Sequence, residues 1–151
     1  MAGQIDAKRL YIPSVAGLYE TLFPLAPALT RMALGFIVIP HGYGKLFLDD
    51  AIHAARNFVN FGWSHPLAWA YFIGGVEFFG GILLMLGLWT RAAALALAIE
   101  MAVISFAVLW PHWEWSHRGM EYPLFMGLIA LSIFCRGSGP YALDNLFKKE
   151  L

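Results

Sequence analysis

Five ionisable side chains lie inside long apolar segments of this sequence. Arg31, His41 and Lys45 fall in the first segment, Glu77 in the second and Glu100 in the third. A charged group at the centre of a bilayer costs roughly 3 kcal/mol or more, so each should face another helix and have a reason to be there. Side chains of these types can bind a polar head group or exchange a proton with it.

Helical spacing predicts that several of these groups share one layer. At about 100° per residue, Arg31, His41 and Lys45 occupy one sector of a helix, which we expect to face the other helices. With a rise of about 1.5 Å per residue, His41 lies roughly 10 Å below the outer end of its segment, and Glu77 and Glu100 roughly 15 Å below theirs. The three groups should therefore meet just outside the midplane.

Neighbouring residues favour a close helix contact at this depth. Pro40 cannot donate a backbone hydrogen bond, and it predicts a kink beside His41. Glu77 lies on a glycine face, with Gly74 three residues before it and Gly81 four after it. Small residues allow helices to approach closely in membranes, so the carboxyl group should lie in a tight seam between helices.

Two interpretations of these groups remain open at this stage. In the first, Lys45 or His41 pairs with Glu77, Glu100 stays protonated, and the set only fixes the register of the helices. In the second, the groups line a polar pocket for a small redox-active or protonatable ligand. In that pocket His41, Glu77 and Glu100 would be the catalytic or proton-exchanging groups.

Other side chains give weaker signals for metal or thiol chemistry. His112, Glu114 and His117 are candidate zinc or iron ligands by type, but their spacing matches no strong metal signature, so we expect no metal site. His41 is the only histidine inside an apolar segment, which argues against a haem held by two histidines. The chain has one cysteine, Cys135, and no flavin or iron–sulfur motif.

The elements that must position these groups are long apolar helices. The 151 residues are 60% hydrophobic and only 13% charged, which favours a single integral membrane domain over a soluble one. We predict an all-α, up-down-up-down bundle of four membrane-spanning helices. Short interfacial helices are expected at residues 11–24 and in the first outer loop, and the spans at about residues 27–48, 67–88, 92–110 and 120–136.

Charge distribution predicts the orientation and excludes some partners. The side that holds both termini carries seven basic residues and the other side three, which places both termini in the cytoplasm of a bacterial inner membrane. The formal net charge is zero, and nothing suggests nucleic acid as a partner. The seven are Lys8, Arg9, Arg31, Arg91, Arg136, Lys148 and Lys149, and the three are Lys45, Arg56 and Arg118.

Several strings in the chain resemble the DoxX family of small bacterial membrane proteins. Arg31 precedes an HGxxK pattern, and a glycine–glutamate–glycine core ends in GLxTR. A glutamate–tyrosine pair and a GxGxYxLD ending follow. These strings are HGYGK at residues 41–45, GGVEFFGG at 74–81, GLWTR at 87–91, EYPL at 121–124 and GSGPYALD at 137–144.

The resemblance covers about residues 27–146 and implies a four-helix protein of the bacterial cytoplasmic membrane. It also implies a link to redox chemistry, because related members are attached to quinone-linked sulfur oxidation, terminal oxidase complexes and oxidant-defence assemblies. The family motifs coincide with polar residues that were singled out above or that open the fourth span. We take these as the ligand-binding set: Arg31, His41, Lys45, Glu77 and Glu121.

Three functional hypotheses follow. The first is a membrane subunit or accessory of a quinone-linked oxidoreductase, not catalytic by itself, with protein partners in a complex or in a homo-oligomer. The second is a non-catalytic structural or assembly subunit of a larger membrane complex. The third is a small solute or proton transporter, which would normally need broken helices at its site.

Overall fold

The computed structural model describes residues 6–147, and this part of the chain is entirely helical, with no strand. Lys148 and Lys149, which were counted in the charge distribution, lie outside the described residues. Three of the described helices are long and apolar enough to cross a membrane. They are α2 (Leu25–Phe47), α4 (Pro66–Leu86) and α5 (Thr90–Val103), which continues as a π-helix over Ile104–Leu109.

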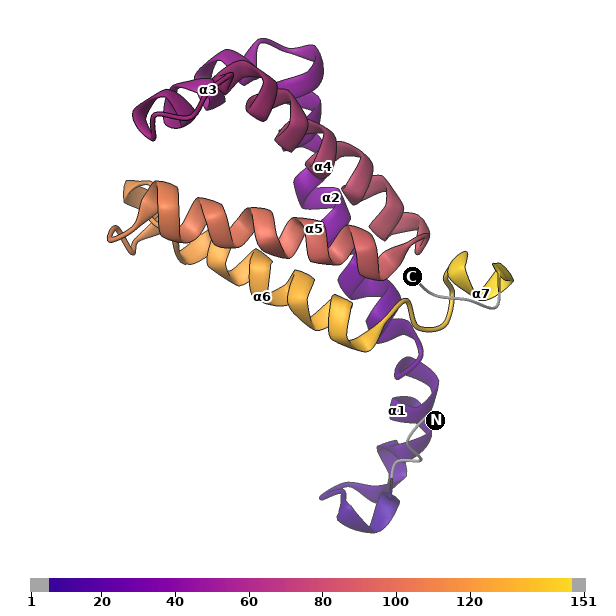
Figure 1. Cartoon of the computed structure of the whole chain (residues 1–151). Coiled ribbons are helices and arrows are strands. Elements are labelled where there is room, and N and C mark those ends of the chain that lie inside the picture. Colours follow the sequence, from indigo (N-terminus) through magenta and orange to yellow (C-terminus); the bar gives the residue numbers. More distant parts are fainter. Residues whose placement is uncertain (1–5, 148–151) are drawn as a thin grey trace.

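A fourth apolar helix, α6 (Glu121–Arg136), lies beside α5 (Figure 1). It has 16 residues, and at about 1.5 Å per residue that is somewhat shorter than the hydrocarbon thickness of roughly 30 Å. Three candidate spans are therefore shown by length and composition, and α6 joins them only by its position and apolar sequence.

The helices bury small residues and expose large apolar ones. Phe36, Phe72, Phe106 and Phe125 are each more than half exposed. The buried faces are rich in glycine, alanine and small polar side chains. This arrangement suits a bilayer, where lipid chains cover the large side chains and small residues let the helices pack closely. It indicates a membrane protein.

Glycines set the contact between α2 and α4. A Cβ atom on Gly42 would overlap the backbone of Gly74 and Phe78, and one on Gly81 would lie 3.1 Å from the carbonyl oxygen of Gly35. The two helix backbones therefore touch at two levels. Side chains beside these glycines are brought within reach of each other. Helix α2 runs unbroken through Pro40.

The segment between α2 and α4 forms the amphipathic helix α3 (Asp50–Asn60), which lies at one end of the structure (Figure 1). Its buried residues Ala51, Ala55 and Phe58 pack with Ala70 of α4. Asp49 occupies the N-cap position, but its side chain makes no capping hydrogen bond. Helix α3 is held by its apolar face.

Helices α1 and α7, near the two ends of the described chain, both lie away from α3 (Figure 1). Helix α1 (Ala16–Leu22) precedes α2, and the short helix α7 (Asp144–Phe147) follows α6. The apolar residues of α1 are exposed, including Leu18, Leu22 and Tyr19. Such a surface is typical of a segment that lies on a membrane.

Candidate functional site: a buried carboxyl pair beside an aromatic pocket

Lys45 and Glu77 form an ion pair between α2 and α4. The Lys45 Nζ donates a hydrogen bond to the Glu77 Oε2 at 2.5 Å. The Glu77 side chain is only 4% exposed and that of Lys45 is 17% exposed. The pair forms because Gly42 and Gly74 bring the two backbones together one turn away. A buried carboxylate is thus paired with a cation from the last turn of α2.

Glu100 of α5 extends this pair into a chain of three groups. The residue is 7% exposed, and the charged groups that act on it are Glu77 and Lys45. Neither Glu100 oxygen has a hydrogen-bond partner among the described residues.

Glu100 also lines a pocket between α3, α4 and α5 with a volume of about 310 Å³. This is close to the lower limit for small-molecule sites, which run from roughly 300 to 1,000 Å³. Glu100 is the only ionisable residue in a lining that is otherwise apolar. The other lining residues are Phe58, Trp63, Trp69, Phe72, Ile73, Val76, Ala96, Ile99 and Val103.

Aromatic rings in mutual contact form one wall of this pocket. The ring centroids of Phe58 and Trp63 are 5.3 Å apart, and those of Trp63 and Trp69 are 5.2 Å apart. Phe72 continues the series at 5.9 Å from Trp69, edge to face. Rings in such contact hold one another in place, and they present apolar faces and edges to a ligand in the pocket. Phe72 and Ile99 are more than half exposed, so lipid would cover that side of the pocket.

His41 does not take part in this site. We expected Arg31, His41 and Lys45 to face the interior together, but His41 is exposed on α2 while Arg31 is buried and Lys45 is half-buried. The sector they define is roughly 80° wide at 100° per residue, and His41 lies at its edge. Gly42 lies beyond the Arg31 edge of that sector, about 100° from His41, so its contact with α4 leaves His41 outside.

Arg31 belongs to a second, separate cluster at the other end of α2. It is 1% exposed and donates from Nη1 to the carbonyl of Leu84 at 2.8 Å and from Nη2 to the carbonyl of Tyr141 at 3.0 Å. Asp144 is its electrostatic partner. Fourteen residues of helix separate Arg31 from Lys45, about 21 Å at the usual rise, so Arg31 cannot touch a ligand beside Glu77.

Asp144 is the residue of this second cluster that the sequence analysis missed. Its carboxylate accepts hydrogen bonds from the backbone N–H groups of Trp89 at 2.7 Å and Thr90 at 3.0 Å. It therefore caps α5 from 54 residues away. The tight turn before α5 needs Gly87, whose φ is +66° and whose Cβ would meet Arg31 and Ala142. The signal was present, because Asp144 ends the quoted GSGPYALD string.

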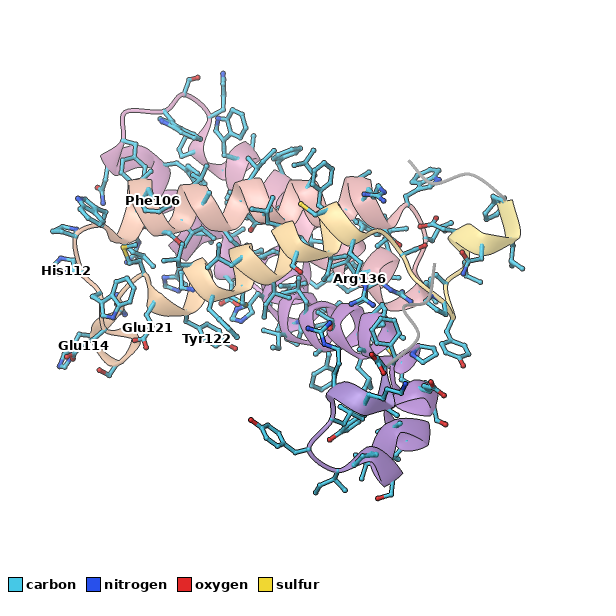
Figure 2. The ribbon with its side chains drawn as sticks, turned by 90° about the horizontal axis from the view of Figure 1, so that it is seen from below. Phe106, His112, Glu114, Glu121, Tyr122 and Arg136 are labelled. Carbon is cyan, nitrogen blue, oxygen red and sulfur yellow. The ribbon has the colours of Figure 1, made fainter. Side chains whose placement is uncertain are left out.

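Glu121 lies in the first turn of α6 and is exposed. Figure 2 shows Glu121 and Tyr122 at the same end of the molecule as His112 and Glu114, with Arg136 at the opposite end of α6. Of the five residues in the expected ligand-binding set, the structure brings together only Lys45 and Glu77. Glu100, which matched no family motif, completes the group.

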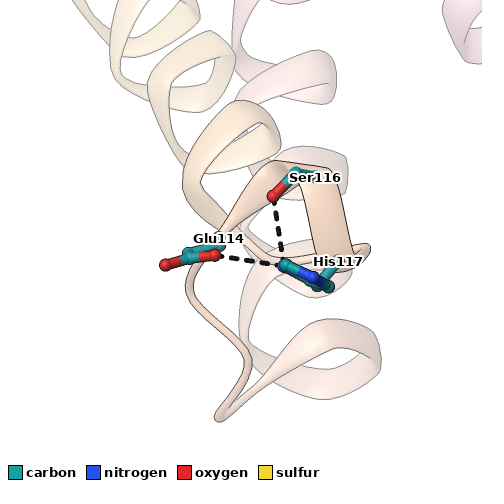
Figure 3. A network of polar contacts seen from close by, with 3 residues as sticks. All are labelled: Glu114, Ser116 and His117. Carbon is teal, nitrogen blue, oxygen red and sulfur yellow. Dashed lines mark hydrogen bonds and ion pairs between the residues drawn. The ribbon is translucent and has the colours of Figure 1, made fainter.

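In the loop between α5 and α6, Glu114, Ser116 and His117 form a small polar network (Figure 3). The His117 Nδ1 lies 3.0 Å from the Glu114 Oε2 and 3.1 Å from the Ser116 Oγ. Both partners meet the same ring nitrogen, whereas a nucleophilic triad needs the serine and the carboxylate on opposite nitrogens. No group of three or more potential metal ligands occurs within residues 6–147, and His112 is simply exposed.

The arrangement can bind one ring-shaped ligand and exchange a proton with it. The aromatic wall would stack against a ring, and Glu100 would hydrogen-bond to an oxygen on that ring. Glu77 and Lys45 continue from Glu100 toward the end of α2 at Phe47. A continuous line of ionisable groups from an apolar pocket toward a surface has the geometry that proton transfer requires.

Comparison with known proteins places the chain in a family. The family model DoxX matches residues 26–110. An uncharacterized protein of Haemophilus influenzae is 33% identical over 138 residues, which cover 87% of this chain and 97% of that protein. No solved structure gives a significant match. The family match includes α2, α3, α4 and α5, and so every residue of the pocket and of the carboxyl pair, and on this basis the chain is a member of the DoxX family.

Proposed function

We propose that this protein is a membrane subunit or accessory of a quinone-linked oxidoreductase complex. The observation that carries the proposal is Glu100, a buried carboxyl group with no donor among the described residues, in the wall of an aromatic pocket. Such a pocket suits the head group of a quinone, which is a planar ring with oxygens at its edge. The isoprenoid tail would lie in the lipid beside Phe72 and Ile99.

The proposal includes a topology. Helices α2, α4, α5 and α6 form an up-down-up-down bundle in the bacterial inner membrane, with both termini in the cytoplasm. Helix α6 spans the membrane with Glu121 at one interface and Arg136 at the other, because long polar side chains can reach the head groups from the ends of a short span. The opposite positions of these two residues support this topology (Figure 2).

Each residue of the site has one role. Glu100 hydrogen-bonds to a ring oxygen of the ligand and exchanges a proton with it. Glu77 passes that proton on, and Lys45 balances the charge of Glu77 and connects it toward the outer surface. Reduction of a quinone to a hydroquinone takes up two electrons and two protons. The electrons come from a partner subunit that carries a redox group, and the protons pass through Glu77 and Glu100.

The first test measures bound quinone. The protein is purified in mild detergent, and its bound lipids are extracted and analysed for quinones, for the unaltered protein and for Glu100→Leu. We expect quinone above the level carried by detergent micelles in the unaltered protein and a loss of most of it in Glu100→Leu. Glu114→Gln is the matched control, because Glu114 is an exposed outer-loop carboxylate outside the pocket.

The second measurement is quinone reduction in membranes that contain the complex. Glu77→Gln should lower the rate by about 10²-fold or more, since general acid–base groups contribute about that much. Glu114→Gln should leave the rate unchanged. Absence of quinone from the purified protein, together with an unaltered rate in Glu77→Gln, would remove the basis of the proposal.

A structural or assembly subunit is the second candidate, and the glycine contacts between α2 and α4 favour it. On that hypothesis, substitutions at these glycines reduce the amount of assembled complex, while Glu77→Gln has little effect. A transporter finds less support, because α2 continues through Pro40 without a break.

A further inference from the structure

A small polar cavity lies between α2 and α6, away from the aromatic pocket. Its volume is about 40 Å³. A water-sized group needs about 10–15 Å³, so this space is comparable to three such groups or to the oxygens of one phosphate. Two guanidinium groups and two hydroxyl groups lie on its lining, those of Arg31, Arg136, Thr30 and Ser132. Because arginine is the residue that best matches the geometry of phosphate, this lining indicates a site for an oxyanion.

Arg31 supplies a buried donor to this cavity. The residue is 1% exposed, and its two Nη atoms donate to the carbonyl groups of Leu84 and Tyr141. Its Nε atom has no hydrogen-bond partner among residues 6–147. A buried donor without a partner is costly, and nearly all such groups in folded proteins have one. An oxygen of a ligand in the cavity would accept this hydrogen bond.

The charge around the cavity is positive. Arg136 is exposed, and its guanidinium carbon lies 5.6 Å from the centroid of the Phe23 ring, a contact that keeps the charge on the arginine. Arg91 lies at the same end of α6, where it donates to the carbonyl of Cys135 at 3.1 Å. Together with Arg31 this makes three guanidinium groups, and Asp144 compensates for one of them. The remaining positive charge favours an anion as the ligand.

An apolar groove of about 370 Å³ continues from the polar cavity along the same two helices. Thr30 lines both spaces, so they meet at this residue. Along α2 the groove extends from Thr30 to Ile37, which is about 10 Å at the usual rise per residue. Its other lining residues are Leu29, Ala33, Leu34, Tyr122, Phe125, Met126 and Ile129. A ligand that fills both spaces needs an anionic head and an apolar chain.

We propose that an anionic phospholipid binds between α2 and α6, with its phosphate against Arg31 and Arg136 and one acyl chain in the apolar groove. Phe23 ends α1, whose exposed apolar face suits a membrane surface, so the polar cavity lies at the level of lipid head groups. Basic pockets between membrane helices bind anionic head groups in this way. A free phosphate ion would use the polar cavity alone. The inference is independent of the quinone pocket, which lies between α3, α4 and α5.

The test compares two lipids and one ion on the delipidated protein in mild detergent. Phosphatidylglycerol and phosphatidylcholine with the same acyl chains are titrated, and native mass spectrometry measures the bound lipid. Inorganic phosphate is added separately and followed by its effect on thermal unfolding, because a ligand that binds the folded state raises the unfolding temperature. We expect one phosphatidylglycerol per chain, bound at least about tenfold more tightly than phosphatidylcholine.

Two variants locate the lipid. Arg136→Gln should weaken the binding of phosphatidylglycerol about fivefold and leave that of phosphatidylcholine unchanged, because it removes a charge from the polar cavity. Ala33→Phe should weaken the binding of both lipids, because the added ring fills the groove at an exposed position of α2. Arg56→Gln, an exposed arginine on α3, is the matched control and should behave like the unaltered protein.

Four results would overturn the inference. Equal binding of the two lipids would show that the site does not select a charge, and unaltered lipid binding in both variants would place the lipid elsewhere. Inorganic phosphate that displaces phosphatidylglycerol, with no effect of Ala33→Phe, would show that the polar cavity takes an ion alone. A lipid-free dimer that Ala33→Phe disrupts would show that the groove holds a second copy of the chain. None of these results bears on the quinone pocket.

Discussion

At the scale of single residues, the Lys45–Glu77 ion pair is the part of the site whose disruption should lower the free energy of unfolding most. Its carboxylate is almost fully buried, and a second carboxyl group lies beside it. Removing one partner of a buried pair is costly because it leaves the other charge without compensation, while removing both partners is often tolerated. This asymmetry gives a test of the pair.

Lys45→Met keeps the apolar stem and removes the charge, so it should lower the free energy of unfolding by roughly 3 kcal/mol. The double variant Lys45→Met/Glu77→Gln should recover much of that loss. The measurement is unfolding in mixed micelles with increasing denaturing detergent. Arg56→Met, at an exposed position of α3, is the control and should change stability by less than about 0.5 kcal/mol. A double variant no more stable than Lys45→Met would show that the two side chains are not coupled.

At the scale of elements, the glycine contact between α2 and α4 determines whether the site can form. The Lys45–Glu77 distance depends on two helix backbones that touch at Gly42. A methyl group at this position has no free space and must push the helices apart. Gly75, also on α4, has no atom within 4 Å of the place where a Cβ would lie. The chain thus offers a matched pair of glycines.

Gly42→Ala should destabilise the protein by about 2 kcal/mol, as expected for overpacking, and it should also weaken ligand binding by separating Lys45 from Glu77. Gly75→Ala should be neutral or should stabilise the helix by up to about 1 kcal/mol, because alanine is the better helix former. Thermal unfolding and the amount of quinone bound to each purified variant give the comparison. Equal tolerance of the two substitutions would mean that the close contact of α2 and α4 is not needed.

At the scale of the whole molecule, the question is which surfaces face which side of the membrane. The chain buries small residues and exposes large apolar ones, as membrane helices do, but α6 has only 16 residues. Helices α1 and α7 both lie away from α3 (Figure 1). If α6 crosses the bilayer, Ser116 and Asn145 must lie on opposite sides.

Cysteine labelling tests this arrangement, because Cys135 is the only cysteine to remove. In a Cys135→Ser background, Ser116→Cys should react with a membrane-impermeant maleimide in cells with a permeabilised outer membrane. Asn145→Cys should react only after the inner membrane is opened, and so should Ser14→Cys. All three positions are exposed in the structure. Labelling of residues 116 and 145 from the same side would show that α6 does not span the membrane.

The sequence by itself determined the helical class, the apolar segments and three of the buried ionisable groups, Arg31, Glu77 and Glu100. Long apolar runs with few charges predict membrane helices, because a helix supplies hydrogen bonds to its own backbone groups where there is no water. The glycines around Glu77 also predicted a close helix contact there, because small residues let membrane helices approach each other. The family motifs pointed to Lys45 and Glu77, which do meet.

Only the tertiary structure decided which of these groups share a site. Helical periodicity gives the angle of a side chain around its own axis, but the rotation and crossing of neighbouring helices depend on contacts between distant residues. The Gly42 contact therefore turned His41 outward. Arg31 has Asp144 as its electrostatic partner, and Asp144 also caps α5 from 54 residues away. The aromatic pocket draws Phe58, Trp63 and Glu100 from separate elements, and no local pattern could have placed them together.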